Sequence, residues 1–279
     1  MRTFFHLPDM RTPAFSSRAA LSLLLAALVS GLFSLSGCTN ASLALYPEFP
    51  ARKASIQTSM LLADYVILDA TMGDTNIVDI AGNKTMAVAL MDKVSDLLNE
   101  KSYRIENRLL SSMGLLMNQA TTAKVMHTFA DQELDEDRLA LKHPPFYLYR
   151  VFEKDTLKEL LASFYSSLIN SVKLEGQKNP VIREAVPLGK TIGGGTWFVL
   201  LTGGYNVPVG RELGVSIPSG STTLGAVGTH QITQVTMMLF VVDTETGELL
   251  WSDQRHEVGG TVHRDRIMRI ADTIMNFLP

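Results

Sequence analysis

The chain has 279 residues, of which 46% are hydrophobic and 19% charged, and 25 basic against 28 acidic side chains leave a net charge of −3. This composition excludes a disordered or collagen-like chain and provides no basic excess for binding nucleic acid. The length allows one large domain or two small ones. The single cysteine excludes an internal disulfide.

Residues 1–37 have the pattern of a secretory signal peptide. Arg2, Arg11 and Arg18 give the leader its positive charge, and the 17 residues from 19 to 35 contain no charged side chain. Such an uncharged run lies at the short end of what spans ~30 Å of hydrocarbon, so a permanent membrane anchor is the alternative.

The next residues indicate lipid attachment. Leu35-Ser36-Gly37-Cys38 resembles the lipobox of bacterial lipoproteins, in which the cysteine thiol receives a diacylglycerol and the leader is cut just before it. The resemblance implies cleavage between Gly37 and Cys38 and acyl chains such as palmitate on Cys38; an ordinary buried cysteine is the alternative. Several acyl chains together hold a protein on a membrane almost permanently. Thr39 stands where an aspartate retains enteric lipoproteins in the inner membrane, which favours the outer membrane.

Residues 38–59 are predicted to form a lipidated tether. They are small and polar, include Pro47 and Pro50, and have neither a helical nor an alternating period. A tether of this length reaches at most about 65 to 70 Å.

Residues 60–279 are predicted to form a single α/β domain with a mixed sheet packed by helices. A buried strand from Leu61, a helix capped by Asn83 and a second strand from about Tyr103 make a strand–helix–strand unit. A strand over 197–201, a hairpin centred on 243–248 and a closing helix over 263–278 follow.

Two segments of this domain are candidate contact surfaces for a partner. Residues 111–187 are predicted to be a mostly helical insertion, with an amphipathic helix that begins at Asp155. Residues 203–229 form a long, glycine-rich loop, and loops of that length are usually functional or mobile.

Asp243, Gly247 and Trp251 are the predicted structural residues of the hairpin. Gly247 stands where the turn requires a positive φ. If Asp243 pairs with Glu248, Phe240 lies opposite Trp251, a favourable aromatic pair.

The order of elements and the sequence LFVVDTETGELLWS at 239–252 resemble a group of bacterial envelope lipoproteins. This group includes the curli secretion-channel lipoprotein, the lipoprotein activators of penicillin-binding proteins and small auxiliary lipoproteins of transport systems. The resemblance implies a two- or three-layer α/β sandwich that works in the cell envelope.

The known sequence motifs of enzymes and metal sites match this chain poorly. Gly189-Lys190-Thr191 would end a phosphate-binding loop only if position 184 were glycine, and it is Glu184. Gly193-Gly194-Gly195 leads into a strand, whereas a dinucleotide fingerprint opens a helix. The acidic run 131–137 lacks the glycine and the final glutamate of a calcium loop.

His256, Glu257, His263 and Asp265 are the best candidates for metal binding or acid–base catalysis. Their residue types suit zinc, but the spacing of His256 and His263 across Gly259-Gly260 does not let one helix present both.

We therefore expect a non-enzymatic lipoprotein of the outer membrane, facing the periplasm, that binds another envelope protein or the cell wall. It is expected to need no cofactor and no metal. A subunit of a secretion or surface-assembly ring is one alternative, and a hydrolase or metal protein that uses His256 and His263 is another. The identity of the partner, the oligomeric state and the membrane leaflet stay open.

Overall fold

The computed structural model describes residues 40–46, 49–54, 56, 58–69, 75–116, 122–126, 146–147, 155–172, 180–207 and 233–279. These residues belong to one compact unit, Thr39–Pro279. The leader, Gly37 and Cys38 lie outside the described residues, as do much of the segment 111–187 and most of the loop 203–229.

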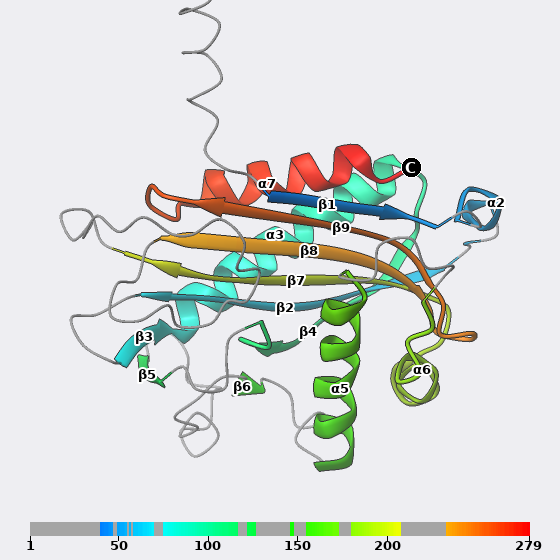
Figure 1. Ribbon diagram of the computed structural model, residues 1–279, viewed down its shortest axis with the longest axis horizontal. Coiled ribbons are helices and arrows are strands. Elements are labelled where there is room, and N and C mark those ends of the chain that lie inside the picture. The colour runs from blue at the N-terminus through cyan, green and yellow to red at the C-terminus, as the bar shows by residue number, and fades with distance from the viewer. Residues whose placement is uncertain are drawn as a thin grey trace, which may run out of the picture. The chain divides into compact units, whose positions relative to one another are not determined.

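One mixed sheet organises the domain (Figure 1). Its main path runs through β1 (Asn40–Leu45), β9 (Leu249–Val258), β8 (Gln234–Asp243), β7 (Thr196–Asn206), β2 (Ser59–Asp69), β3 (Thr75–Asp79) and β5 (Thr122–Met126). β4 (Ile105–Met113) also pairs with β2, and β6 (Phe146–Tyr147) pairs with β4. β2 is parallel to β4 and β7, whereas β7, β8, β9 and β1 are antiparallel in succession. The predicted α/β class with a mixed sheet is confirmed.

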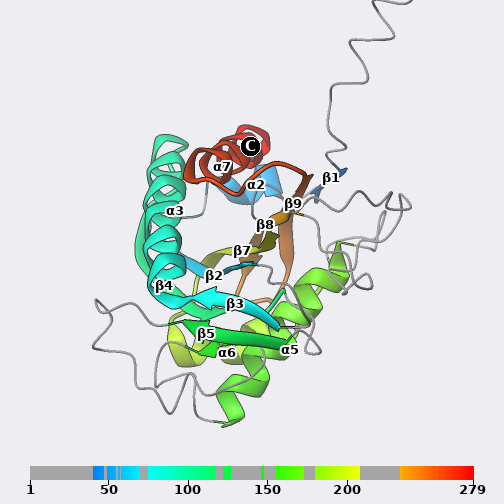
Figure 2. The ribbon, with the colours of Figure 1, turned by 90° about the vertical axis from the view of Figure 1, so that its left-hand side faces the viewer.

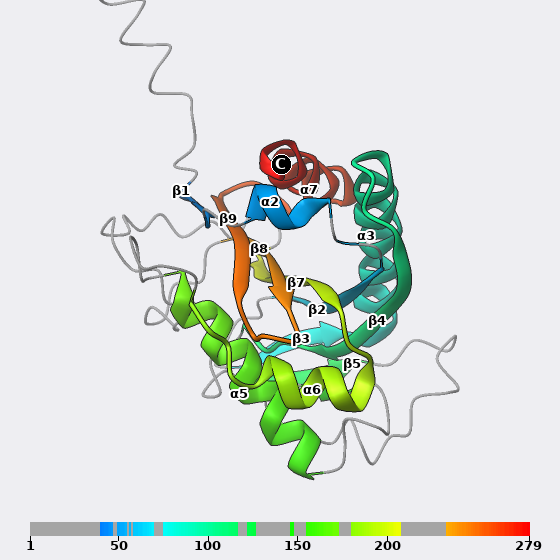
Figure 3. The same ribbon diagram turned by 90° about the vertical axis from the view of Figure 1, so that its right-hand side faces the viewer.

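Helices cover both faces of this sheet, which gives three layers (Figures 2 and 3). On one face, called the α3 face, alternate strand residues such as Leu61, Phe198 and Leu239 pack with α3 (Ile80–Glu100) and α7 (Arg264–Phe277). On the opposite α5 face, residues such as Leu62 and Trp197 pack with α5 (Asp155–Ser171) and α6 (Ala185–Ile192). The period of two along each strand therefore produces two separate hydrophobic cores.

The helix α3 begins three residues before the predicted cap. Asp79 is the N-cap, and its side chain accepts a hydrogen bond from the backbone N–H of Gly82 at 3.0 Å. Asn83 lies inside the helix instead, where its amide group bonds the N–H and C=O of Ile67 on β2. Asn83 therefore links the first turn of α3 to the sheet. Its prediction as the N-cap was wrong because its side chain forms hydrogen bonds with the backbone of β2 and does not cap the helix.

The predicted tether is wrong for residues 40–46 and 49–53, which are folded onto the domain. β1 pairs with β9 along its whole length, from Asn40 with His256 to Leu45 with Trp251. The short helix α2 (Phe49–Lys53) then inserts Phe49, which is fully buried and stacked against Tyr103 with ring centroids 6.5 Å apart. The sequence pattern missed this strand because a backbone ladder on a sheet edge does not require large alternating side chains.

The segment 111–187 contains strands as well as the predicted helices. β4 runs on to Met113, and the short strands β5 and β6 follow before α5 and α6. The predicted amphipathic helix is α5, and it places Phe164 edge-on against Trp197 at 6.0 Å between ring centroids.

The closing helix α7 buries Ile267, Ile270 and Ile274 against the α3 face. Phe277, near the end of this helix, is 49% exposed, and the guanidinium of Arg255 lies over its ring at 4.5 Å from the ring centroid. Within the described residues, no helix is long and apolar enough to cross a membrane.

Candidate functional site

The turn between β8 and β9 is built by its own side chains. The N–H of Asp243 donates to the carbonyl of Glu248 at 2.9 Å, and the N–H of Gly247 donates to the carbonyl of Asp243 at 2.7 Å. The carboxylate of Asp243 accepts from the N–H of Glu245 at 2.8 Å and of Thr246 at 3.3 Å. Gly247 has φ 78°, a conformation that favours glycine.

The register of the hairpin differs from the predicted one. Val241 lies opposite Trp251 and Phe240 lies opposite Ser252, because a bulge between Val241 and Val242 gives β9 one additional residue. The predicted pairing of Phe240 with Trp251 is therefore wrong. Trp251 is fully buried on the α3 face, whereas Phe240 is fully buried on the α5 face.

Neighbouring segments hold the turn in place. The N–H and hydroxyl of Thr244 both donate to the carbonyl of Gly195, at 3.0 and 2.8 Å. On the other side, the N–H of Ile182 donates to the carbonyl of Gly247 at 2.7 Å. A Cβ atom on Gly247 would lie 2.8 Å from the carbonyl oxygen of Ile182, so close packing as well as φ requires glycine. These contacts therefore hold the β8–β9 turn in one conformation without a ligand.

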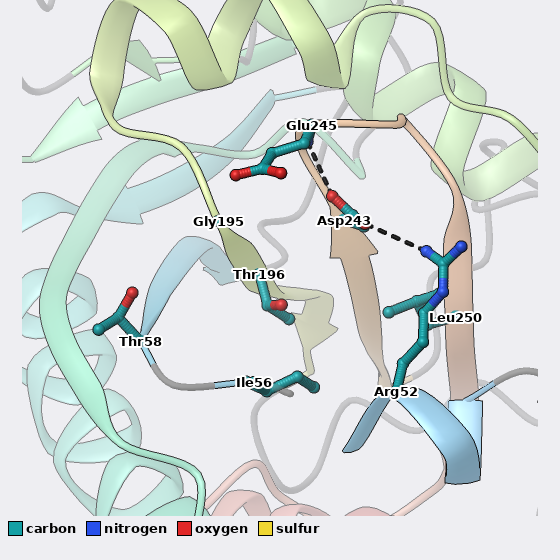
Figure 4. Close-up of a pocket in the computed structure, with 8 residues that line it drawn as sticks. All are labelled: Arg52, Ile56, Thr58, Gly195, Thr196, Asp243, Glu245 and Leu250. Atoms are coloured by element: carbon teal, nitrogen blue, oxygen red, sulfur yellow. Dashed lines mark hydrogen bonds and ion pairs between the residues drawn. The ribbon is translucent and has the colours of Figure 1, made fainter. Parts of the chain in front are cut away.

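A pocket of about 240 Å³ lies between this turn, α2 and the first residues of β2 and β7 (Figure 4). Arg52 of α2 forms part of its wall and contacts Asp243 Oδ2 at 3.1 Å and Glu248 Oε2 at 2.6 Å. The residues that line this pocket, called the hairpin pocket, are Arg52, Ile56, Thr58, Gly195, Thr196, Asp243, Glu245 and Leu250.

The charges at the hairpin pocket are predominantly negative. Asp243 and Glu245 contribute two carboxylates to its lining, against the one guanidinium of Arg52, and the carboxylate of Glu248 contacts Arg52 from outside the lining residues. Glu245 is exposed, and Figure 4 shows its carboxylate directed away from Arg52. The hydroxyls of Thr58 and Thr196 add hydrogen-bonding groups. A site of this size and charge suits an amino or guanidinium group better than an anion.

The four residues of the predicted metal or acid–base cluster are not brought together. His256 lies on the α5 face, where its Nδ1 is 2.8 Å from the hydroxyl of Thr236. Glu257 points to the other face and accepts from Arg266 Nε of α7 at 3.0 Å. Burial, and then the charge of Arg266, lowers the pKa of His256. His263 and Asp265 belong to the start of α7, and within the described residues no group of three metal-ligating side chains forms.

A buried carboxyl group in the core was not predicted from the sequence. Asp64 of β2 is fully buried on the α5 face and accepts from the hydroxyl of Ser112 and the N–H of Leu115, each at 2.9 Å. Burial raises its pKa to about 7, although these hydrogen bonds act in the opposite direction. Next to it, Ser111 Oγ lies 2.6 Å from the hydroxyl of Tyr165, so a polar network joins β2, β4 and α5. An acidic residue inside the apolar run 61–68 is the signal that could have revealed it.

The two glycine motifs of the sequence have roles in close packing and in backbone conformation. Gly189-Lys190-Thr191 lies on α6, where a Cβ on Gly189 would meet the side chain of Thr244 at 2.7 Å. Gly193 and Gly195 adopt positive φ between α6 and β7, which agrees with the expectation that this run leads into a strand.

Comparisons with known proteins identify no family. No family model matches the chain, and no curated protein matches it. Among solved structures, it is similar to the PelC dodecamer from Paraburkholderia phytofirmans, with 7% identity, a TM-score of 0.28 and coverage of 85% of this chain and 92% of that one. It is also similar to lipoprotein GNA1162 from Neisseria meningitidis, with 12% identity, a TM-score of 0.25 and coverage of 78% and 96%. At these TM-scores the similarity carries no argument about function.

Proposed function

We propose that the protein is a bacterial envelope lipoprotein, acylated on Cys38, that acts as a non-enzymatic adaptor for another envelope protein. The basic leader, the uncharged run and Leu35-Ser36-Gly37-Cys38 support export and acylation. Thr39 supports the outer membrane, with the folded domain in the periplasm. The separation of His256 from Glu257 by the sheet supports a binding role over catalysis at that cluster.

The observation that carries the adaptor role is the acidic hairpin pocket on a fixed turn. A basic side chain of the partner would enter the pocket beside Glu245 and Asp243, while Arg52 keeps Asp243 and Glu248 in position. Because the turn is already held by Gly195 and Ile182, binding would require little ordering of the loop. The partner is therefore a protein that presents an exposed lysine or arginine.

Site-specific photo-crosslinking in intact cells tests this adaptor role. A photoreactive amino acid at position 246, an exposed residue of the same turn, should give a discrete adduct with one envelope protein. The same amino acid at Val88, which is 48% exposed on α3, is the matched control and should not give it. The charge reversal Glu245→Lys, combined with the probe at 246, should reduce the adduct at least several-fold, because it places a cation where the partner's cation binds and keeps the Asp243 carboxylate that builds the turn. Equal adducts from positions 246 and 88, or an adduct that Glu245→Lys leaves unchanged, would contradict the proposed role of the pocket.

A further inference from the structure

The first strand of the domain starts almost directly after the proposed lipid-bearing residue. β1 begins at Asn40, so only Thr39 separates it from Cys38. Its far end is secured by the N–H of Tyr46, which donates to the carbonyl of Leu250 at 3.4 Å, and by the fully buried ring of Phe49. Detaching β1 from β9 would lengthen the tether, but it would break the six-residue backbone ladder between the two strands and remove the packing of Phe49.

This short connection limits how far the domain can stand from its membrane. Two extended residues span at most about 7 Å, compared with the 65 to 70 Å of a 20-residue tether. On the basis of the proposed acylation of Cys38, we propose that the sheet is held end-on at the bilayer. The end with Asn40 faces the lipid headgroups, and the hairpin pocket faces away from them.

The two ends of the sheet carry different elements (Figure 1). At the Asn40 end lie the last residues of β2, β7 and β9, joined by Asn206 Nδ2 donating to Asp69 Oδ1 at 2.9 Å and by the N–H of Val262 donating to Asn206 Oδ1 at 3.2 Å. The exposed or partly exposed side chains there include Val258 and Arg264, an apolar and a long basic side chain that the headgroup region accommodates.

The opposite end carries α2, the β8–β9 turn and the chain terminus. Lys53 Nζ of α2 donates to the carbonyl of Pro279 at 2.8 Å, and Arg52 contacts the turn. The ten residues of β9 run between the two ends, and at ~3.3 Å per residue they place the hairpin pocket roughly 30 Å farther from the bilayer. This orientation makes the pocket accessible to a periplasmic partner and keeps it away from lipid.

Energy transfer to the bilayer surface tests the orientation in the full, acylated protein. Cys38 is the only cysteine, and acylation blocks its sulfur, so a cysteine introduced elsewhere is the only reactive thiol. Donor dyes are placed at exposed positions on either end, through His263→Cys or Thr246→Cys. Each labelled protein is reconstituted into phosphatidylethanolamine–phosphatidylglycerol vesicles that contain an acceptor-labelled headgroup. We expect transfer from position 263 to exceed that from position 246 several-fold.

A linker variant is the matched control. Inserting roughly 20 glycine and serine residues between Thr39 and Asn40 keeps the lipid and the fold but releases the domain, so the difference between positions 263 and 246 should largely disappear. Equal transfer from both positions without the linker, in protein whose mass shows an acylated Cys38, would overturn the orientation and leave the lipoprotein role standing. Protein with an unmodified Cys38 would instead overturn the proposed function.

Discussion

Replacing Trp251 with alanine should lower the free energy of unfolding by ~3 to 5 kcal/mol. Trp251 is fully buried on the α3 face of β9, opposite Val241 on the neighbouring strand. Its indole N–H has no hydrogen-bond partner among the described residues, so the loss comes from the cavity and the lost apolar contacts. Because the indole is large and the surrounding sheet is rigid, the neighbouring side chains cannot move far enough to fill the cavity.

Urea unfolding of Trp251→Ala beside Val88→Ala measures this effect. Val88 is 48% exposed on α3, so its truncation should change the unfolding free energy by less than ~0.5 kcal/mol. A Trp251→Ala midpoint as close to wild type as that of the control would mean that β9 is not packed against α3 and α7 as described.

Replacing Asp64 with asparagine should change how stability depends on pH. Burial raises the pKa of Asp64 from an ordinary value of 3.8 to about 7 in the folded protein. Between these two values the folded state binds the proton and the unfolded state does not, so this group's contribution to stability is lost as the pH rises from about 4 to 7. The pKa difference corresponds to at most ~4 kcal/mol. Asparagine cannot ionise and should remove this loss.

The measurement is the unfolding free energy of wild type and Asp64→Asn at several pH values between 4 and 8. The stability of the variant relative to wild type should increase by up to ~4 kcal/mol over this range, and most of the increase should precede pH 7. Asp96→Asn, at an exposed position of α3, is the control and should run parallel to wild type. Parallel curves for Asp64→Asn as well would show that the Asp64 carboxyl is hydrated and ionises normally.

Apolar runs for the strands and helical periodicity for the helices predicted the elements that face both cores. The strands β2, β7, β8 and β9 and the helices α3, α5 and α7 lie within a few residues of their expected positions. Their buried faces are long and regular, so the sequence pattern alone defines them. The same pattern could not predict the edge strand β1, in which Leu43 and Leu45 are 48% and 50% exposed. It also could not predict the bulge beside Val241, which moved Trp251 to the other face.

The candidate site was less predictable than the fold. Asp243 and Gly247 stood out because a turn has local sequence rules. Arg52 did not, because its partners Asp243 and Glu248 lie some 190 residues away along the chain and the contact exists only after β1 and α2 have folded onto the hairpin. Asp64 likewise acquires its raised pKa from burial in the core, which forms only after distant segments pack around it, and its hydrogen bonds from Ser112 and Leu115 offset part of that rise.

Intact-mass and tandem mass spectrometry of the native protein, extracted from membranes, tests the central claim most directly. A protein whose first residue is Cys38, with a diacylglycerol thioether on its sulfur and an acylated amino group, is the predicted result. A chain that retains residues 1–37 and has a bare thiol at Cys38 would contradict the lipoprotein account, and with it the end-on orientation at the bilayer.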